Sequence, residues 1–267
     1  MRKLLSASAA LAALLATPAL AADLATKAPV YKAPPPAYVS SWTGCYLGAN
    51  AGGGWGNRTG DREAIDVNNA TIAAGIGLPV TMGTSSRGAV GGGELGCNYQ
   101  TGLFVFGIET DFQASGIRGS STIMTVPGGI ADTTVGTGSE QLQWFGTVRG
   151  RVGIAPINNL LLFGTGGLAY GRVQDAATLA FIPIADGNYA GMTSETKVGW
   201  TAGAGAEYAF WRNWSVKLEY LYMDLGATDV LMTDPTRANQ SIDYRFQHRD
   251  NIVRVGVNYK WDAWFGR

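Results

Sequence analysis

The sequence predicts an all-β fold, an eight-stranded antiparallel up-and-down barrel, and three observations support that prediction. From Trp42 onward, apolar and polar side chains alternate with period two, as in strands whose two faces meet different surroundings. Long polar connections alternate with tight turns along the chain. The 38 glycines follow no collagen period and form no polar low-complexity tract, so we expect them inside short ordered strands.

The segment before the barrel reads as an export signal and a tether. Residues 1–21 form a secretory signal: two basic residues, an apolar run to Leu15 and Ala-Leu-Ala as a cleavage site. Residues 22–41 are rich in proline and alanine without a hydrophobic period, which predicts an extended periplasmic tail. No apolar run of 18 or more residues follows the signal, so the sequence argues against a helical membrane span.

The barrel is expected over residues 42–261, followed by a short tail at 262–267. Its eight strands are predicted, in order, at 42–56, 89–100, 104–114, 142–154, 160–172, 195–210, 214–225 and 251–261. Four long connections, at 58–87, 116–140, 173–194 and 226–249, alternate with short turns at 101–102, 156–159 and 211–213. Long loops at one end and short turns at the other are typical of outer-membrane barrels, whose long loops face outside the cell.

The strands are amphipathic in the same sense. In the strand 104–114, Phe104 and Phe106 oppose Glu109 and Asp111. In the strand 142–154, Leu142 and Trp144 are predicted on the apolar face, with Gln143 opposite, whereas the run Leu160 to Phe163 leaves the facing of the next strand open. Lys and Arg are absent from the centres of the apolar faces, as a lipid-facing belt requires. Aromatic residues are expected in two interfacial girdles: Trp42, Tyr99, Trp144, Trp200, Tyr208, Trp214, Tyr220, Tyr259 and Trp261.

Short motifs in a fixed order resemble a known family. They are Trp42-Thr43-Gly44, Phe106-Gly107-Ile108-Glu109, Thr147-Val148-Arg149-Gly150-Arg151, Gly166-Gly167-Leu168-Ala169-Tyr170-Gly171 and Leu218-Glu219-Tyr220-Leu221-Tyr222. Together they resemble the small alphaproteobacterial outer-membrane barrels of the RopB type, related to the OmpA membrane domain and the opacity proteins. The resemblance implies an eight-stranded surface-exposed barrel with roles in envelope integrity and in host or environment contact. A haem-binding activity is reported for some relatives.

The closing strand also resembles an assembly signal. Arg254, Gly256, Tyr259 and Trp261 follow the pattern by which the barrel assembly machinery recognises outer-membrane barrels. In that pattern the final aromatic is the last residue, whereas six residues follow Trp261 here.

Charged residues on the inward faces are predicted to share one narrow lumen. They are Glu94, Glu109, Asp111, Arg149, Arg151, Lys197, Glu207, Lys217, Glu219, Arg254 and Lys260. Eight strands leave an interior just wide enough to fill with side chains, so opposite charges there must pair. A structural salt-bridge plug and a narrow ion path are both open interpretations, and an open nutrient pore is disfavoured.

The two cysteines, Cys45 and Cys97, are expected near the periplasmic rim on the outward faces of neighbouring strands. An oxidising compartment favours a cross-strand disulfide, and barrel stagger leaves two free thiols as the alternative. His248, the single histidine, is expected to point inward near the outer mouth, as an ordinary rim residue or, as a weak candidate, a haem ligand. It faces the wrong way for the membrane-exposed serine and histidine of lipid-modifying barrel enzymes.

Other sites are disfavoured. One histidine cannot build the usual zinc sites or histidine-based catalytic sets. The glycine-rich stretch 91–96 continues into a strand instead of a helix, so it does not predict a nucleotide site. The 20 positive residues balance the 20 negative ones, and nothing indicates nucleic acid. The sequence therefore predicts a non-enzymatic structural and surface-interaction protein of the cell outer membrane, without cofactors. Its expected partners are membrane lipid, the assembly machinery and external surface ligands. A narrow channel and a haem receptor are the alternatives.

Overall fold

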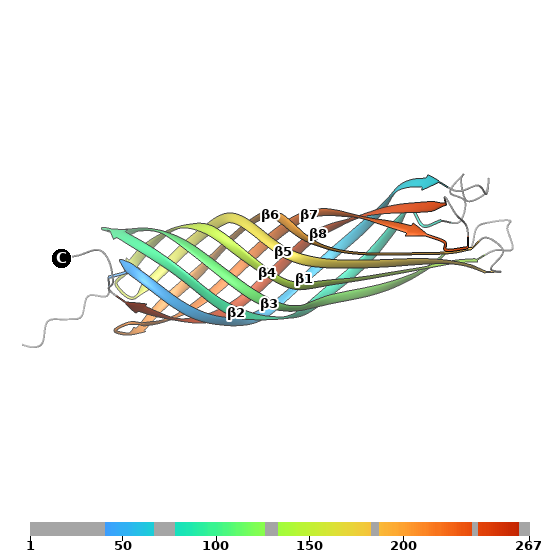
Figure 1. Cartoon of the computed structure of the whole chain (residues 1–267). Coiled ribbons are helices and arrows are strands. Elements are labelled where there is room, and N and C mark those ends of the chain that lie inside the picture. The colour runs from blue at the N-terminus through green and yellow to red at the C-terminus, as the bar shows by residue number, and fades with distance from the viewer. Residues whose placement is uncertain (1–40, 67–77, 126–132, 183–186, 237–239, 262–267) are drawn as a thin grey trace, which may run out of the picture. The chain divides into compact units, whose positions relative to one another are not determined.

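The computed structural model describes residues 41–66, 78–125, 133–182, 187–236 and 240–261. They form one closed barrel of eight strands (Figure 1): β1 (Gly44–Asp66), β2 (Thr81–Thr101), β3 (Phe104–Thr125), β4 (Thr133–Ile157), β5 (Leu160–Ile182), β6 (Asn188–Trp211), β7 (Trp214–Thr233) and β8 (Ser241–Trp261). The predicted signal, nearly all of the tail and residues 262–267 lie outside the described residues. No helix in the described part of the chain is long and apolar enough to cross a membrane.

Every strand pairs antiparallel with its neighbours in the chain, and β1 closes the ring by pairing with β8. The closing pair extends from Cys45 opposite Trp261 to Asp66 opposite Ser241. Three two-residue turns join β2 to β3, β4 to β5 and β6 to β7, at the places where short turns were predicted. The first of them contains Gly102 at φ 58°, a left-handed conformation that glycine adopts without strain.

The strands are longer than predicted, because most of the predicted long connections are themselves strand. The shortest, β7, has 20 residues and the longest, β4, has 25, whereas about 9 to 11 residues cross a membrane. The segments 58–66, 116–125 and 133–140, for example, were predicted as connections but belong to β1, β3 and β4. These segments were predicted as loops because they contain many polar residues. In the structure those polar residues lie on the outward face of each strand.

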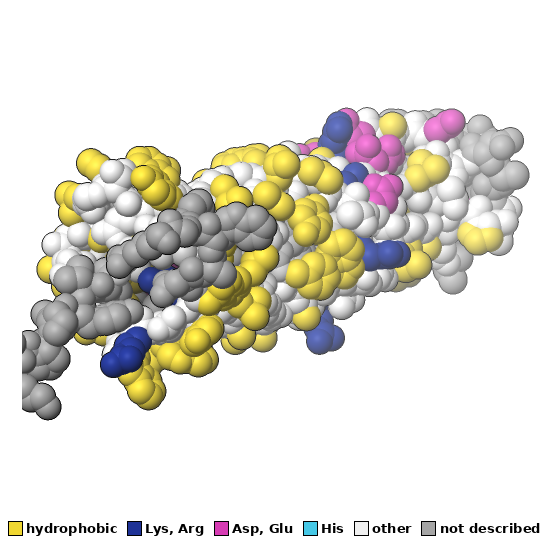
Figure 2. All heavy atoms as spheres, turned by 60° about the vertical axis from the view of Figure 1, so that its left-hand side comes forward, with side chains coloured by type: hydrophobic (Ala, Val, Ile, Leu, Met, Phe, Trp, Pro, Cys, Tyr) yellow, Lys and Arg dark blue, Asp and Glu magenta, His cyan; other side chains and the backbone are white. Residues whose placement is uncertain are grey.

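The two halves of each strand differ in which face is apolar. The turn half carries the apolar outward residues and comprises residues 45–55, 89–99, 104–114, 144–154, 160–170, 198–211, 214–222 and 253–261; the remaining strand residues form the far half. In β8, Val253, Val255 and Val257 face outward in the turn half, whereas Ile242 and Tyr244 are buried inside the far half. Every second residue faces inward along the whole of β8, but the apolar face is the outer one in the turn half and the inner one in the far half. Figure 2 shows one face, where hydrophobic side chains crowd the turn end and acidic ones gather toward the opposite end.

Local bulges correct one predicted orientation. The β4–β5 register shifts between Leu142 and Trp144. As a result Leu142, predicted outward, is fully buried in the lumen, and Gln143, predicted inward, donates to Gln174 Oε1 of the neighbouring strand at 2.9 Å. A bulge adds one residue to one strand and exchanges the faces beyond it, which a period-two reading cannot detect. In β5, Leu161 and Phe163 face inward and Leu162 faces outward.

The longest interruption of strand pairing in the described residues lies between β6 and β7. Their regular pairing stops at Trp200 opposite Asp224 and returns only at Ala190 opposite Thr233. The register differs by one residue across this interruption, which lies in the far half apart from residues 198 and 199 of β6. On its other edge β6 stays paired with β5 throughout the same segment.

Candidate functional site

Nine of the predicted lumen charges form a buried network inside the turn half, here called the central ion cluster. Its members are Glu94, Glu109, Asp111, Arg149, Arg151, Glu207, Lys217, Glu219 and Arg254, all of them buried. Strand periodicity places them there, since each occupies an inward position of its strand. Five carboxylates meet four cations, so the charges nearly cancel within the barrel.

Arg149 is the centre of this network. Its guanidinium contacts three carboxylates: Nη1 lies 2.7 Å from Glu219 Oε1, Nη2 lies 2.9 Å from Asp111 Oδ2, and Nη2 also bonds Glu109. Arg254 Nη2 lies 2.8 Å from Asp111 Oδ2 and 2.7 Å from Glu219 Oε2, from the opposite side. Two arginines therefore share two of the same carboxylates. Removing either one would leave buried charge without its partner, which is strongly destabilising.

Lys217 and Arg151 complete the network on the side of the short turns. Lys217 Nζ lies 2.6 Å from Glu94 Oε1 and 2.9 Å from Glu109 Oε2. Arg151 bonds Glu207 and stacks its guanidinium over the Phe163 ring at 3.7 Å. Stacking suits arginine, whose planar and weakly hydrated cation packs well on aromatic faces.

Three carboxylates, Glu94, Glu109 and Glu219, bring oxygens within 4.8 Å of one another, a spacing that a metal ion could bridge. The Lys217 ammonium is within 3.8 Å of an oxygen of each of them. The lysine therefore already supplies the positive charge at this position, and the arrangement fits an internal ion cluster better than a metal site.

Glycines make room for the arginines. A Cβ on Gly52 would lie 2.6 Å from Arg254 Cα, and one on Gly167 would lie 2.7 Å from Arg149 Cα. Both distances are shorter than real carbon contacts. Bulky cations thus face side-chain-free positions on the neighbouring strands, which explains part of the high glycine content.

Neutral groups that the sequence prediction did not single out donate further hydrogen bonds to the carboxylates of this cluster. Tyr46 Oη donates to Glu109 at 2.5 Å, Asn50 Nδ2 to Glu94 at 2.9 Å and Thr147 Oγ1 to Asp111 at 2.7 Å. Ser215 Oγ and Asn258 Nδ2 both donate to Glu207, at 2.6 and 3.0 Å. Inward parity was a usable signal for Thr147, Ser215 and Asn258, because each lies at an even spacing from a predicted charge on its own strand.

Two predicted members lie outside the central ion cluster. Lys197 lies in the far half beside the β6–β7 interruption and pairs with Glu195 at 2.8 Å, with its side chain 24% exposed. Lys260 lies at the turn end, where its ammonium bonds the Ser41 carbonyl oxygen. Both residues have the predicted inward parity, but parity says nothing about height along the barrel, and neither joins the central ion cluster.

A second buried group, the far ion cluster, was not predicted as a group, and only its member His248 was expected to point inward. It contains Arg58, Glu140, Asp175, His248 and Asp250. Arg58 Nε lies 2.6 Å from Glu140 Oε2, and Arg58 Nη2 lies 3.3 Å from Asp250 Oδ2. Four of its members fell in predicted connections. The even spacing of His248 and Asp250 from Arg254 could have found them.

The far ion cluster holds more acid than base, and its electrostatics reflect this. Burial raises the pKa of Glu140 to about 7, against the opposing effect of Arg58. Burial likewise raises the pKa of Asp175 to about 6. Desolvation penalises the charged form of a carboxyl, and one arginine cannot offset it for several acids.

His248 is fully buried, not at an open rim. Its Nε2 lies 3.0 Å from Asp175 Oδ2 and 3.0 Å from Thr228 Oγ1. The inward orientation agrees with the prediction, but Phe246 and Tyr244 follow it on the inward face of β8 and are themselves buried. A planar ligand as large as haem would have to displace this packing to reach the ring.

Three apolar layers alternate with the two ion clusters and fill the lumen. The inward face of β8 shows the order from the turn end: Arg254 in the central ion cluster, Ile252, then Asp250 and His248, and finally the apolar run from Phe246 to Ile242. Ile252 packs with Leu142, Phe145 and other buried residues, and Ile242 packs with Met232, Tyr244 and their neighbours. A third layer of Trp42, Val105 and Phe163 closes the turn end.

Trp42 thereby corrects a girdle prediction, since only 4% of its surface is exposed and it lies inside the barrel. Its backbone nitrogen donates to Gln100 Oε1 at 2.8 Å. Outward aromatics do occur at the turn end, where Trp214 and Tyr259 meet edge to face at 5.1 Å. Tyr259 therefore faces the surroundings, whereas Arg254 of the same predicted assembly signal is buried, and the signal itself stays a prediction.

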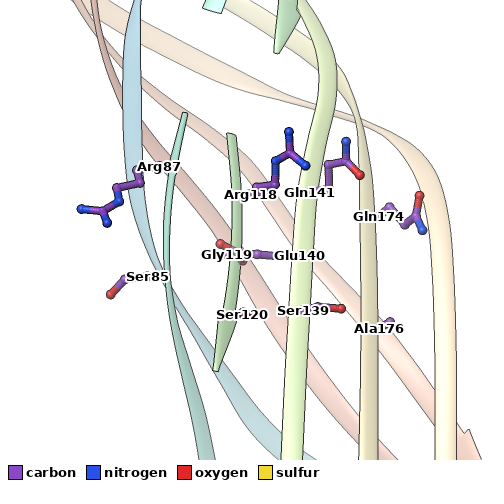
Figure 3. Close-up of a pocket in the computed structure, with 10 residues that line it drawn as sticks. All are labelled: Ser85, Arg87, Arg118, Gly119, Ser120, Ser139, Glu140, Gln141, Gln174 and Ala176. Atoms are coloured by element: carbon purple, nitrogen blue, oxygen red, sulfur yellow. The ribbon is translucent and has the colours of Figure 1, made fainter. Parts of the chain in front are cut away.

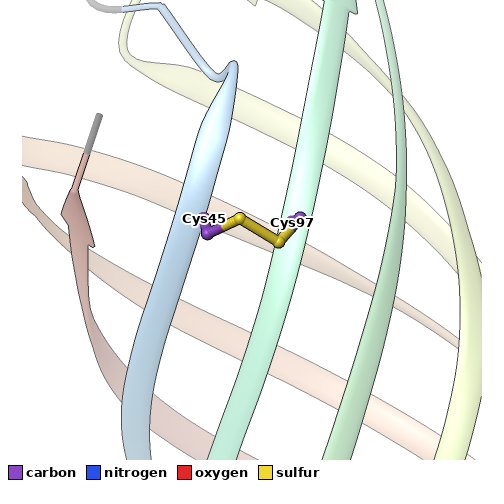
Figure 4. Close-up of a disulfide and its surroundings, with 2 residues drawn as sticks. All are labelled: Cys45 and Cys97. Carbon is purple, nitrogen blue, oxygen red and sulfur yellow. A yellow bond between two sulfur atoms is a disulfide. The ribbon is translucent and has the colours of Figure 1, made fainter. Parts of the chain in front are cut away.

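A disulfide joins Cys45 and Cys97 in the structure (Figure 4). The two residues are direct partners in the β1–β2 ladder, with Cα atoms 4.0 Å apart. The stagger that left free thiols open as an alternative therefore does not separate them. The bond closes a loop of 52 residues in the first hairpin.

Comparisons with known proteins agree with this architecture. The profile of the family described as outer membrane protein beta-barrel domain matches residues 7–260. A 31 kDa outer-membrane immunogenic protein of Brucella melitensis biotype 1 is 39% identical over 255 residues, which cover 95% of this chain and 98% of that protein.

More distant relatives have similar names. A 22 kDa outer membrane protein of Rhizobium leguminosarum bv. viciae is 32% identical over 172 residues, covering 64% of this chain and 66% of that protein. A 25 kDa outer-membrane immunogenic protein of Brucella abortus biovar 1 is 27% identical over 270 residues, covering 98% and 99%. Among solved structures, the outer membrane protein OprG of Pseudomonas aeruginosa is 12% identical with a TM-score of 0.47, covering 84% of this chain and 99% of that one.

Proposed function

This chain belongs to the outer membrane protein beta-barrel domain family and resides in the cell outer membrane, where we propose that it acts as a non-enzymatic structural and surface-interaction protein. In this proposal the turn half lies in lipid and the far half extends from the outer surface. The turn half thus reinforces the membrane, and the outward polar side chains of the far half meet external ligands. Several relatives are named immunogenic, which fits exposure at the cell surface.

The filled lumen is the observation that carries the structural role. An ion or nutrient crossing the barrel would pass three apolar layers and two paired ion clusters. Water-filled channels belong to barrels with about twice as many strands. The lumen charges therefore act as internal bracing, and the rival role as a narrow ion path requires them to exchange partners.

Planar-bilayer recording separates bracing from conduction. We expect the wild-type barrel to give no steady conductance. Arg149→Glu, which removes a cation and adds a sixth carboxylate to the central ion cluster, should produce flickering or leak currents. The matched control Arg172→Glu changes an exposed outward arginine and should behave like wild type. Steady single-channel currents from the wild type would assign the barrel to transport instead.

Surface exposure is tested by labelling single introduced cysteines in intact cells. Thr122→Cys is exposed in the far half and should react with a membrane-impermeant maleimide. Asn158→Cys is exposed in a short turn and should react only after the outer membrane is permeabilised. The reverse pattern would invert the orientation and remove the surface role.

The structural role predicts a deletion phenotype. Cells lacking the protein should become more sensitive to detergent and chelator, and the wild-type gene should restore resistance. Full resistance of the deletion strain under envelope stress would count against a structural contribution. Lipid turnover by the purified protein would instead favour the enzymatic rival.

The haem-receptor alternative receives little support from the burial of His248. A titration of the folded protein with haem, with and without His248→Ala, decides it. Saturable binding that His248→Ala abolishes would replace the structural proposal with ligand capture.

A further inference from the structure

A hollow of about 490 Å³ lies on the outer wall of the barrel, across β2, β3, β4 and β5 (Figure 3). It sits at the start of the far half, just beyond the outward apolar residues. Its floor is made of small residues, including Ser120 and Ser139, which are direct cross-strand partners. Longer side chains border it in a row formed by Arg87, Arg118 and Gln141 with Gln174. The result is a polar recess at one defined height of the wall.

Two arginines without an ion-pair partner among the described residues border the recess. Arg87 and Arg118 are direct partners in the β2–β3 ladder, and both are exposed. Like charges placed directly opposite each other on a sheet repel, and Figure 3 shows the Arg87 side chain turned away from Arg118. Among the described residues neither guanidinium forms an ion pair. Glu140 borders the recess, but its carboxylate is buried and bound to Arg58 at 2.6 Å.

The outward arginines of β8 are neutralised, whereas the exposed Arg172 of β5 donates to Ser194 Oγ at 3.2 Å. Arg249 Nε lies 3.1 Å from Asp224 Oδ2, and Arg245 lies 3.5 Å from Asp229 and 3.7 Å from Glu63. The pair at the recess is therefore unlike its counterparts on β8. Guanidinium groups bind phosphate oxygens through charge-assisted hydrogen bonds, so an uncompensated pair fits an anion of that kind.

The wall immediately below the recess is aromatic. Phe112 and Trp144 stack with centroids 5.5 Å apart, and Trp144 meets Tyr170 edge to face at 6.3 Å. Trp144 is the cross-strand partner of Ala114 on β3 and of Arg172 on β5, so the aromatic strip adjoins the polar row. In the outer membrane this boundary lies where acyl chains meet headgroups, since aromatics gather at that level.

We propose that the recess binds the phosphate-bearing headgroup of an outer-leaflet lipid. Arg87 and Arg118 turn toward a phosphate between them, Gln141 donates to neighbouring headgroup oxygens, and the acyl chains lie along Phe112 and Trp144. A bound phosphate removes the repulsion between the two guanidiniums. The aromatic strip distinguishes a lipid from free phosphate, because inorganic phosphate has nothing to place on it.

The test measures lipid binding to the folded full chain in a nonionic detergent, by native mass spectrometry. Bisphosphorylated lipid A, its dephosphorylated form and inorganic phosphate serve as probes. We expect the bisphosphorylated lipid to bind at least tenfold more tightly than the dephosphorylated one. Arg87→Gln with Arg118→Gln should weaken binding at least tenfold. The matched double variant Arg245→Gln with Arg249→Gln should stay within twofold of wild type.

A second variant leaves both arginines in place. Ser139→Asp adds a carboxylate to the floor of the recess, where it should pair with the arginines, repel phosphate and weaken binding of the bisphosphorylated lipid at least tenfold. Far-UV circular dichroism checks that each variant is folded. Equal binding of the two lipid forms, unchanged binding by the recess variants, or displacement of the lipid by millimolar inorganic phosphate would each overturn the proposal.

Discussion

The turn half and the far half of this barrel solve the same packing problem in opposite ways. In the turn half Arg149, Lys217 and Arg254 face inward and valines face outward, while in the far half apolar residues fill the inside and Arg245 and Arg249 face outward. In the proposed orientation, lipid supplies the apolar environment for the turn half, and the chain supplies its own for the far half. One set of strands thus obeys membrane rules at one end and the rules of a soluble barrel at the other.

The ion clusters show the same contrast. The central ion cluster nearly balances its charges, and Arg149 alone contacts three carboxylates. The far ion cluster sets a single arginine, Arg58, among several acids. The far ion cluster has more buried carboxyls than cations, so its stability should depend on whether they are protonated. The central ion cluster is paired throughout, so its stability should depend on every member. The halves should therefore fail under different perturbations.

The largest expected effect comes from removing the hub of the central ion cluster. Arg149→Ala leaves Glu109, Asp111 and Glu219 short of a buried partner, which should lower the free energy of unfolding by about 3 to 5 kcal/mol. Urea unfolding in lipid vesicles, followed by tryptophan fluorescence, measures it. The exposed Arg172→Ala serves as the control, with a change within about 0.5 kcal/mol. Similar small changes in both variants would mean that the central cluster is not a stabilising brace.

A smaller and more local loss is expected from the apolar layer of the far half. Ile242→Ala removes buried methyl groups and should cost about 2 to 4 kcal/mol. Amide hydrogen exchange should then show lost protection in the far part of β8 and in its β7 partners, with residues 253–259 unchanged.

Val255→Ala on the same strand is the control for Ile242→Ala, because Val255 is half exposed on the outside of the turn half. We expect a change below about 1 kcal/mol, since lipid can follow the smaller side chain. A uniform loss of protection along β8 after Ile242→Ala would show that the two halves unfold as one unit.

The smallest expected effect is a pH dependence confined to the far half. The pKa of Glu140 is raised to about 7 and that of Asp175 to about 6, so the folded state binds more protons than the unfolded chain between about pH 4 and 7. The contribution of these two carboxyls to the stability of the far half should be fully present below about pH 4 and should be lost as the pH rises to 7. Amide hydrogen exchange in the far half, corrected for the effect of pH on the intrinsic exchange rate, measures this change in stability.

Glu140→Gln provides the matched variant for the pH series. It should remove the Glu140 part of the dependence and stabilise the far half at pH 8. A far half that gains protection as the pH rises from 5 to 8 would contradict the sign of this argument.

The turn half could be predicted from the sequence because its alternation is simple. Phe104, Ile108 and Val255 repeat on one face, and Glu109, Asp111 and Arg254 repeat on the other, with short turns between the strands. Nine of the eleven predicted lumen charges lie in the central ion cluster for this reason. Period and polarity agree there, and both are visible in the sequence.

The far half could not be predicted by the same rule. Its outward residues are polar, so segments such as 116–125 resembled loops although their inward residues, including Ile117, pack in the lumen. The bulge near Leu142 exchanged faces without a sequence signal. Height along the barrel is set by strand stagger, which explains why Lys197 and Lys260 shared a parity with the cluster but not a position.

The interrupted pairing between β6 and β7 fixes an upper limit for the hydrocarbon around the barrel. Between residues 191 and 199 the edge of β6 that faces β7 lacks a regular ladder. In acyl chains each such backbone amide or carbonyl would cost several kcal/mol, because no water is available to replace the missing partner. The hydrophobic slab must therefore end near Trp200, where the seam becomes regular again, independently of any side-chain hydrophobicity.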